Sequence, residues 1–162
     1  MFNRRRLLEQ ARLELERAYR FERPVSFVML DIDYFKRITD TYGHPVGDEV
    51  LRALANLIRN SVREIDVVCR YGGNEFAVLM PETTLEEARA VAERLRLDTE
   101  RMQVATEVAE IAVTISLGVA TTLGQVIELD TLIMGVDNAL YAAKDAGRNY
   151  VRLAQVIADP EI

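Results

Sequence analysis

Several features that define other protein classes are missing from this sequence. It has one cysteine, Cys69, so an internal disulfide cannot form and a reducing compartment is expected. No apolar run approaches the roughly 18 residues that a membrane-spanning helix needs. The first residues, MFNRRRLLEQ, lack the apolar core of a signal peptide. These absences predict a soluble, folded, cytoplasmic domain.

Positive charge is also scarce. The chain has 20 Lys and Arg residues against 26 Asp and Glu residues, which gives a net charge of −6. Such a domain is a poor general binder of nucleic acid, because phosphate contacts need clustered Lys and Arg. A small anionic ligand can still bind where a metal ion or a local basic patch helps. Neither G-x-G-x-x-G nor G-x-x-x-x-G-K-[ST] occurs, so a bound nucleotide would not use either of these glycine loops.

The 162 residues suit one domain, and no repeat or linker divides them. Hydrophobic periodicity predicts helices over residues 4–21, 34–41, 45–62, 84–102 and 130–146. Strands are predicted over residues 25–30, 66–71, 74–80, 110–122 and 150–153, with Gly72-Gly73 as a two-residue hairpin turn. This order lacks regular βαβ alternation. It predicts an α+β, two-layer α/β domain with a central mixed, partly antiparallel five-stranded sheet flanked by helices.

Two acidic residues, Asp31 and Asp33, follow the apolar strand at 25–30. The carboxyl edge of a sheet is where α/β proteins commonly bind ligands, and carboxylate oxygens suit Mg²⁺. For Asp33 alone, the favoured interpretation is an N-cap of the next helix. Asp31 has no such structural role, and a buried carboxylate is costly unless something binds it. Asp31 is therefore the first candidate ligand of a metal.

The second candidate feature is the segment Gly72-Gly73-Asn74-Glu75. Its two glycines leave no side chain to block a close backbone approach, and they tolerate positive φ. Alone, a Gly-Gly pair indicates an ordinary hairpin turn. Together with Asp31 it favours a phosphoryl-transfer site, which needs carboxylates from two nearby strands close to the phosphates.

These residues belong to a set of motifs that resembles the GGDEF domain of bacterial diguanylate cyclases over nearly the whole chain. FNRRRL (2–7), DIDYFKRITDTYGHPVGDEVL (31–51) and CRYGGNEF (69–76) resemble the family's N-R segment, its D-x-D-x-F-K-x-x-N-D-x-x-G-H-x-x-G-D-x-x-L motif and its R-Y-G-G-[DE]-E-F signature. VTISLGVA (113–120) and DNALYAAKDAGRN (137–149) resemble its closing strand and helix. Because several separated motifs keep their order and intervals, the chain is identified as a member of this family.

The resemblance implies a palm-like fold related to nucleotidyl cyclases. It also implies that two GTP molecules condense into cyclic di-GMP with release of pyrophosphate. Each domain would bind one GTP, and the active unit would be an antiparallel homodimer in which a ribose 3′-OH attacks the partner's α-phosphate. A divalent cofactor, Mg²⁺ or Mn²⁺, would activate that hydroxyl and neutralise the phosphates.

The resemblance also implies roles for individual residues. The catalytic and metal-binding set would be Asp31, the Ile32 carbonyl, Asn74 and Glu75. The substrate would contact Phe35, Lys36, Thr39, Asp48, Gly72, Gly73, Lys144 and Arg148. Among these, Asp48 would accept from the guanine edge, and Lys144 and Arg148 would share one helix face and reach the phosphates. Without the family, an acid in the first turn of a helix and two cations at a helix end would equally indicate compensation of helix dipoles.

Two positions depart from the family pattern. Asn74 stands where active members usually have Asp or Glu, and losing a charged group from such a site typically slows catalysis by about 10²-fold or more. Thr39 stands where Asn is usual, and one hydroxyl cannot make the paired contact of an amide with guanine. Both changes predict a domain that folds well and has weakened or lost catalysis.

Arg63 and Asp66 resemble the family's inhibitory R-x-x-D site, in which Arg stacks on guanine and Asp accepts from its edge. A lone R-x-x-D would indicate only a solvated turn. Two functions stay open: a diguanylate cyclase inhibited by its product, or a degenerate module that binds cyclic di-GMP or GTP and regulates an attached domain. We expect residues 1–162 to be a single domain of a longer signalling protein with a sensor or effector domain, and a membrane-anchored parent is compatible with this.

Overall fold

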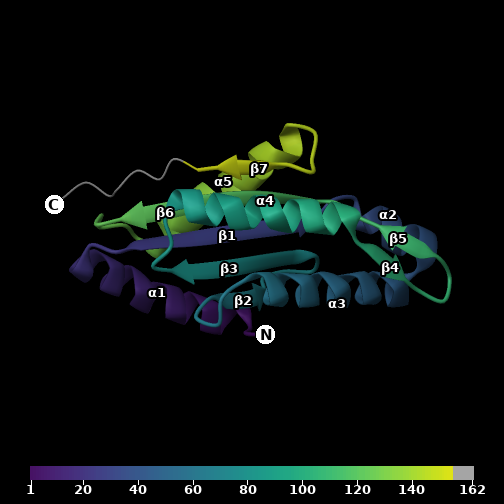
Figure 1. The fold of residues 1–162 in the computed structure, drawn as a ribbon, viewed down its shortest axis with the longest axis horizontal. Helices are drawn as coiled ribbons and strands as arrows, with labels where there is room; N and C mark the ends of the chain where they lie inside the picture. Colours follow the sequence, from purple (N-terminus) through teal and green to yellow (C-terminus); the bar gives the residue numbers. More distant parts are fainter. Residues whose placement is uncertain (155–162) are drawn as a thin grey trace.

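Helices cover both faces of a central sheet in the computed structural model, which describes residues 1–154 (Figure 1). The helices are α1 (Arg4–Phe21), α2 (Phe35–Tyr42), α3 (His44–Ser61), α4 (Leu85–Arg101) and α5 (Leu129–Asp145). The strands are β1 (Pro24–Ile32), β2 (Val67–Arg70), β3 (Glu75–Pro81), β4 (Gln103–Ala105), β5 (Glu110–Ala112), β6 (Ile115–Leu123) and β7 (Val151–Leu153). Among these residues, no helix has the length and hydropathy to cross a bilayer.

The main sheet has five strands in the order β2-β3-β1-β6-β7. Neighbouring strands are antiparallel except β6 and β7, which are parallel. β1 is the central strand, and its last residues pair with the first residues of β3 and β6. The predicted mixed five-stranded sheet is confirmed, and a separate two-stranded sheet, β4-β5, is added to it.

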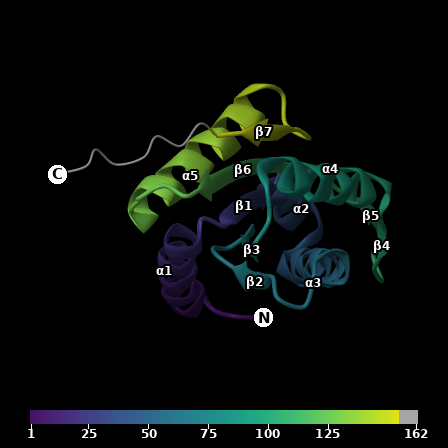
Figure 2. The ribbon, with the colours of Figure 1, turned by 60° about the vertical axis from the view of Figure 1, so that its left-hand side comes forward.

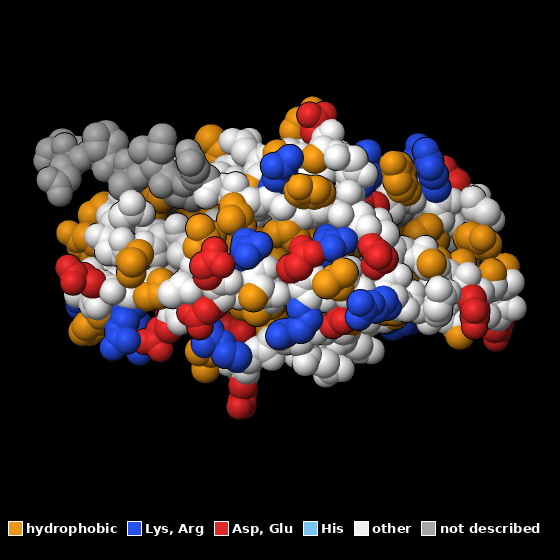
Figure 3. All heavy atoms as spheres, turned by 45° about the horizontal axis from the view of Figure 1, so that its top comes forward, with side chains coloured by type: hydrophobic (Ala, Val, Ile, Leu, Met, Phe, Trp, Pro, Cys, Tyr) orange, Lys and Arg blue, Asp and Glu red, His pale blue; other side chains and the backbone are white. Residues whose placement is uncertain are grey.

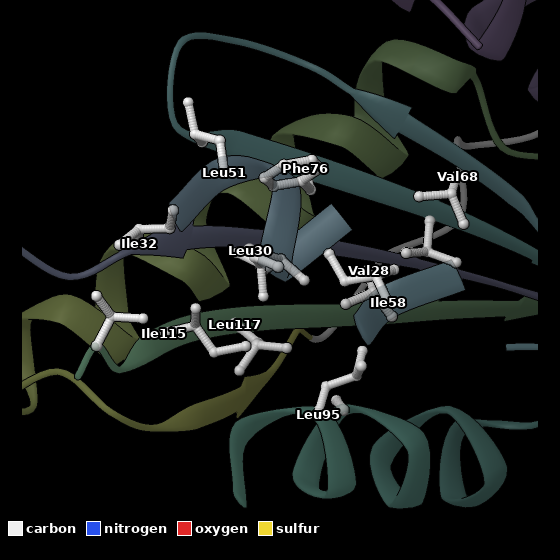
Figure 4. Close-up of a cluster of buried hydrophobic side chains, with 14 of the residues drawn as sticks. Val28, Leu30, Ile32, Leu51, Ile58, Val68, Phe76, Leu95, Ile115 and Leu117 are labelled. Atoms are coloured by element: carbon white, nitrogen blue, oxygen red, sulfur yellow. The ribbon is translucent and has the colours of Figure 1, made fainter. Parts of the chain in front are cut away.

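The two faces of the sheet bury different cores because side chains alternate along each strand. Val28, Leu30 and Ile32 of β1 pack with α3 and α4 in one core, part of which is drawn in Figure 4. Phe27 and Met29 pack with α1 and α5 in the other. Figure 2 shows α1 and α5 on one side of the sheet and α3 and α4 on the other, so the helices flank the sheet as a layer on each face. By the same alternation, Asp31 projects toward α1 and α5.

The prediction of a single strand over residues 110–122 is wrong. The chain there first pairs as β5 with β4 and then crosses to the main sheet as β6. β4 and β5 each bury one residue, Val104 and Ile111, in the α3–α4 core. Three-residue strands of this kind carry too short a period to be recognised from sequence.

Gly118 explains how closely α5 packs on β6. A Cβ atom added at Gly118 would lie 2.5 Å from the carbonyl oxygen of Val136 and 2.6 Å from the amide nitrogen of Leu140. Only glycine therefore allows the backbones of β6 and α5 to approach to this distance. This contact holds the middle of α5 against β6.

Candidate functional site

Two carboxylates face each other across neighbouring strands. Asp31 of β1 pairs directly with Glu75 of β3, and side chains at such positions lie about 5 Å apart at Cβ. Burial raises the pKa of Asp31, whose residue is 6% exposed, and Asp33 raises it further, while Lys144 and Arg148 lower it. Burial also raises the pKa of Glu75, with Asp31 and Asp137 adding to the effect. The ionised pair is therefore short of positive charge.

Lys144 from α5 supplies part of that charge. Its Nζ donates a hydrogen bond to Oδ2 of Asp31 and forms an ion pair with it. The second oxygen, Oδ1, is buried and accepts no hydrogen bond within residues 1–154. A buried carboxylate oxygen without a donor is costly. It therefore marks a point where a cation or a donor from a ligand would be stabilised.

Asn74 is hydrogen-bonded to the backbone of Ile32 in the neighbouring strand β1. Its Nδ2 donates to the carbonyl oxygen of Ile32 at 3.2 Å, and the Ile32 amide donates to the Asn74 carbonyl oxygen at 3.2 Å. The Ile32 carbonyl is the backbone oxygen that the resemblance assigns to a metal. Within residues 1–154, no three His, Cys, Asp or Glu side chains converge as a metal-binding group. A cation between Asp31 and Glu75 would thus need an uncharged oxygen as well.

The glycine turn differs from the prediction. The hairpin has four loop residues, 71–74, rather than two, and φ is negative at both glycines. The amides of Tyr71 and Gly72 donate to the Glu75 carbonyl oxygen at 2.8 and 3.2 Å, and Nη2 of Arg70 donates to the Gly73 carbonyl oxygen at 2.6 Å. A Cβ added at Gly73 would meet nothing within 4 Å. The glycines therefore serve to keep the loop free of side chains, and positive φ is not their role.

The expectation that Asp33 caps a helix is wrong. The N-cap of α2 is Tyr34, without a side-chain hydrogen bond. Asp33 is buried and accepts from the hydroxyls of Thr114 and Ser116, each at 2.7 Å, and from the backbone amide of Asn149 at 2.9 Å. Asp33 therefore ties the end of β1 to β6 and to the segment that follows α5.

Lys144 and Arg148 do not share a helix face, because α5 ends at Asp145. Arg148 lies beyond the helix, with φ of 67°, and its amide donates to the Ala143 carbonyl oxygen at 3.2 Å. Its guanidinium lies over the ring of Tyr34, with Cζ 4.7 Å from the ring centroid. Lys144 and Arg148 still both lie near Asp31 at the end of β1. The turn at Gly147, and not a shared helix face, brings Arg148 there.

The resemblance places Phe35 and Lys36 along the phosphates and Thr39 at the guanine base, and all three lie on α2. Asp48, also assigned to guanine, lies on α3, which covers the face of the sheet opposite to the Asp31 side chain. Phe35 and Thr39 pack against Gly47, where an added Cβ would lie 2.7 Å from Cγ2 of Thr39. Oγ1 of Thr39 donates to the Lys36 carbonyl oxygen at 3.0 Å, and the Lys36 residue is exposed. Within residues 1–154, no hydrogen bond or ion pair joins this group to Asp31 or Glu75.

Asp48 is exposed and lines a cavity of about 300 Å³. The cavity also includes Leu51 of α3, Arg70 at the end of β2 and Phe76 of β3. It therefore lies beside the glycine loop, with an apolar wall and both an acidic and a basic side chain at its edge. This composition suits a flat polar ring such as a nucleobase.

Arg63 and Asp66 bind each other. The Asp66 side chain is fully buried and accepts from the Arg63 amide at 2.8 Å and from its guanidinium at 3.2 Å. The same guanidinium donates to the Pro81 carbonyl oxygen at 2.8 Å and to Oγ1 of Thr83. The Arg63 side chain is nonetheless 48% exposed. A ligand at this pair would have to replace some of these internal bonds.

Several residues of the site have no role in the sequence prediction. The ring of Tyr34 stacks with the Arg148 guanidinium, and the Asn149 amide donates to Asp33. The charge of Asp137 on α5 raises the pKa of Glu75. The Asn149 side chain further accepts from Arg96 of α4 at 3.1 Å. Tyr34, Asp137 and Asn149 all lie inside the family-like segments 31–51 and 137–149, so their positions were a signal, although the motifs did not indicate their contacts.

Comparison with known proteins adds independent evidence. The family model described as "Diguanylate cyclase, GGDEF domain" matches residues 1–150. The response regulator PleD of Caulobacter vibrioides is 43% identical over 153 residues, which are 93% of this chain and 34% of PleD. The chain spans between about a fifth and a third of the length of the curated relatives that it matches.

Solved structures agree with the fold. The GGDEF domain of DgcB from Caulobacter crescentus, in complex with c-di-GMP, superposes with a TM-score of 0.87 at 28% identity and covers 96% of this chain and 89% of that chain. The active GGEEF domain of a diguanylate cyclase from Vibrio cholerae superposes with a TM-score of 0.88 at 32% identity, covering 94% and 97%.

Proposed function

This chain belongs to the GGDEF domain family of diguanylate cyclases, and on that basis we propose that it binds GTP and slowly condenses two molecules of it into cyclic di-GMP. The observation that carries the proposal is the buried, unpartnered Oδ1 of Asp31 opposite Glu75. Lys144 and Arg148 lie at the same strand end, where the phosphates of a nucleotide need positive charge.

A divalent cation fits the donor set at this strand end. Asp31 and Glu75 would hold it with carboxylate oxygens. The Ile32 carbonyl or Oδ1 of Asn74 would complete the set once the hydrogen bond from Asn74 Nδ2 to the Ile32 carbonyl oxygen is broken. When bound, Mg²⁺ or Mn²⁺ would neutralise the phosphates and favour loss of the proton from the attacking hydroxyl. The unpartnered Asp31 oxygen supports this assignment.

The other side chains would bind and orient the substrate. Lys144 and Arg148 would donate to the phosphates, and the exposed Asp48 would accept from the N–H groups of guanine. In each half-reaction, a 3′-oxygen loses its proton and bonds to an α-phosphorus, and pyrophosphate leaves. The attacking hydroxyl would belong to a GTP on a second copy of the chain, so the proposal includes an antiparallel homodimer.

Thr39 would reduce the selectivity of the site for guanine. Its hydroxyl proton is used within α2, in the bond to the Lys36 carbonyl oxygen. Only the acceptor lone pairs of Oγ1 remain for a base, whereas the amide of Asn offers both a donor and an acceptor. We expect weaker discrimination between guanine and other purines than in a member with Asn at this position.

A second candidate function is favoured by Asn74. Its side-chain amide donates a hydrogen bond to the Ile32 carbonyl oxygen and brings no charge to the cation site. A domain in this state would bind GTP or cyclic di-GMP and act as a regulatory module for an attached domain of a longer protein. Binding of cyclic di-GMP would use Arg63 and Asp66, whose contacts with Pro81 and Thr83 hold the pair in place.

One experiment separates the two functions. The domain at high concentration is incubated with GTP and Mg²⁺, then with Mn²⁺, and cyclic di-GMP and pyrophosphate are measured beside Asn74→Asp and Asp31→Asn. Product from the unaltered chain, lost in Asp31→Asn, supports the cyclase. Product from Asn74→Asp alone supports the regulatory module, with calorimetry of cyclic di-GMP binding as its direct test. Unchanged product in Asp31→Asn would refute the site.

A further inference from the structure

Tyr34 holds a backbone conformation that bulky side chains rarely adopt. It lies between β1 and α2 with φ of 56° and ψ of 32°, in the left-handed region. A bulky residue in this region is an outlier, and such strain clusters at functional sites. The residue is 47% exposed, so the side chain is not there to fill the core. The strain therefore needs a different explanation.

The ring of Tyr34 is a platform for two cations. Cζ of Arg37 lies 4.3 Å from the ring centroid and Cζ of Arg148 lies 4.7 Å from it. Contacts of this kind attract a guanidinium to the face of the ring. Arg148 is itself in the left-handed region, with φ of 67°. Two residues with left-handed backbones, far apart in sequence, thus meet through their side chains.

The contact is part of a clamp between two segments. Asp33 accepts from the backbone amide of Asn149, and the next residue, Tyr34, stacks with the side chain of Arg148. The two residues that follow β1 therefore hold two consecutive residues after α5. Asp33 fixes the backbone of that segment, and Tyr34 fixes the direction of the Arg148 side chain.

Stacking leaves the guanidinium able to bind a ligand. Within residues 1–154, the Arg148 side chain donates no hydrogen bond and forms no ion pair, although its charge acts on Asp31. A guanidinium stacked face-on keeps its N–H donors at the edge of the plane, where they match the oxygens of phosphate. We propose that Tyr34 is a positioning residue that holds Arg148 for the triphosphate. This inference rests on the proposed binding of GTP.

The test measures nucleotide affinity by calorimetry with the full chain. The ligands are a GTP analogue with a methylene bridge between the α- and β-phosphates, which cannot react, and guanosine. Tyr34→Asn removes the ring and keeps a residue that tolerates the left-handed region, while Tyr34→Phe keeps the ring. We expect Tyr34→Asn to weaken binding of the analogue about five- to tenfold, Tyr34→Phe to stay within about twofold, and guanosine affinity to stay constant.

A matched control is Tyr150→Asn, because Tyr150 is similarly exposed and lies under Arg152 at 4.8 Å, outside the proposed site. It should leave the affinity unchanged. In an Arg148→Ala background, Tyr34→Asn should cost nothing further, since its effect passes through Arg148. Full additivity of the two changes, or an equal loss in Tyr34→Phe, would overturn the inference.

A readout without ligand separates this inference from the proposed function. The NMR resonance of Arg148 Hε, assigned with Arg148→Lys, should be shifted by the ring in the unaltered chain and in Tyr34→Phe. It should move toward its unshifted position in Tyr34→Asn. No binding of the analogue by the unaltered chain would refute the proposed function, whereas an unmoved Hε resonance would refute the positioning by Tyr34.

Discussion

Replacing Asn74 by Asp changes the residue that separates the two proposed functions. The change removes the Nδ2 donor that lies 3.2 Å from the Ile32 carbonyl oxygen. It also adds a third carboxylate next to Asp31 and Glu75, whose pKa values are already raised by burial. Without a divalent cation, we therefore expect Asn74→Asp to fold less stably than the unaltered chain.

The size of the loss follows from two contributions. One hydrogen bond of this kind contributes about 1 kcal/mol, and repulsion from partly exposed like charges adds about 1 kcal/mol. The free energy of unfolding should thus fall by about 2 kcal/mol at pH 7. A cation bound at about 100 times its Kd stabilises the folded state by about 2.7 kcal/mol, so saturating Mg²⁺ should offset the whole loss.

Urea unfolding with and without Mg²⁺ measures both effects, and Asn74→Ala is the matched control. The Ala variant also loses the amide donor but gains no charge, so it should lose about 1 kcal/mol and recover less with Mg²⁺ than Asn74→Asp does. In the same preparations, synthesis of cyclic di-GMP by Asn74→Asp should exceed that of the unaltered chain by about 10²-fold.

Two results would refute this reasoning. If Asn74→Asp is as stable as the unaltered chain without a cation, then neither the hydrogen bond to Ile32 nor repulsion of a carboxylate at position 74 by Asp31 and Glu75 contributes to stability. If Mg²⁺ stabilises Asn74→Asp and Asn74→Ala equally, then residue 74 contributes nothing to cation binding.

Three further predictions concern pH, packing and the R-x-x-D pair. The folded-state pKa of Glu75 lies above its ordinary value of 4.5, so between those two values the native state holds more protons than the unfolded state. The free energy of unfolding therefore falls as pH rises through that window. Glu75→Gln should stabilise the protein most at neutral pH and least below pH 4.5, as measured by urea unfolding across pH. Gly118→Ala should lower the unfolding free energy by about 1–3 kcal/mol, because its Cβ would clash with the Val136 carbonyl, and an unchanged melting temperature would contradict that packing. Thr83→Val removes the hydroxyl that accepts a hydrogen bond from the Arg63 guanidinium, so calorimetry should show cyclic di-GMP binding about twofold to fivefold more tightly. An unchanged affinity would contradict a contact between Arg63 and the ligand.

The main elements could be predicted because their signals are local. The helix predicted over 84–102 is α4, and Thr84 with Glu87 forms its capping box, in which each side chain accepts from the other residue's backbone amide. The apolar run at 25–30 is the centre of β1 and is buried on both faces of the sheet. In each case the residues that determine the structure lie within one turn or one strand.

Other elements depend on distant partners. The four-residue hairpin loop is set by amides that bind the Glu75 carbonyl and by the Arg70 side chain across the loop. The role of Asp33 depends on Thr114 and Asn149, which the fold brings from two other segments. No spacing in the sequence indicates which of several hydrogen-bond partners a carboxylate will meet. The prediction of a capping role failed for this reason.

The site residues fall between these cases. The motifs located Asp31, Glu75, Lys144 and Arg148 at one strand end, and the structure brings these four together. The motifs could not indicate that the Asn74 amide turns toward the Ile32 carbonyl, because that choice depends on the register of β1 and β3. The two proposed functions thus differ at a single side chain, that of Asn74.

The arrangement of charge explains how an acidic chain could bind a polyanion. Over the face shown in Figure 3, acidic and basic side chains are interspersed, without a broad field of one sign to steer a nucleotide. At the strand end, however, Lys144 already neutralises one oxygen of Asp31, and Arg148 is held on Tyr34. Binding of a triphosphate would then exchange partners within a local cluster, since Lys144 must leave Asp31 to reach a phosphate. Such an exchange releases Asp31 for a cation, which couples the affinities for cation and nucleotide.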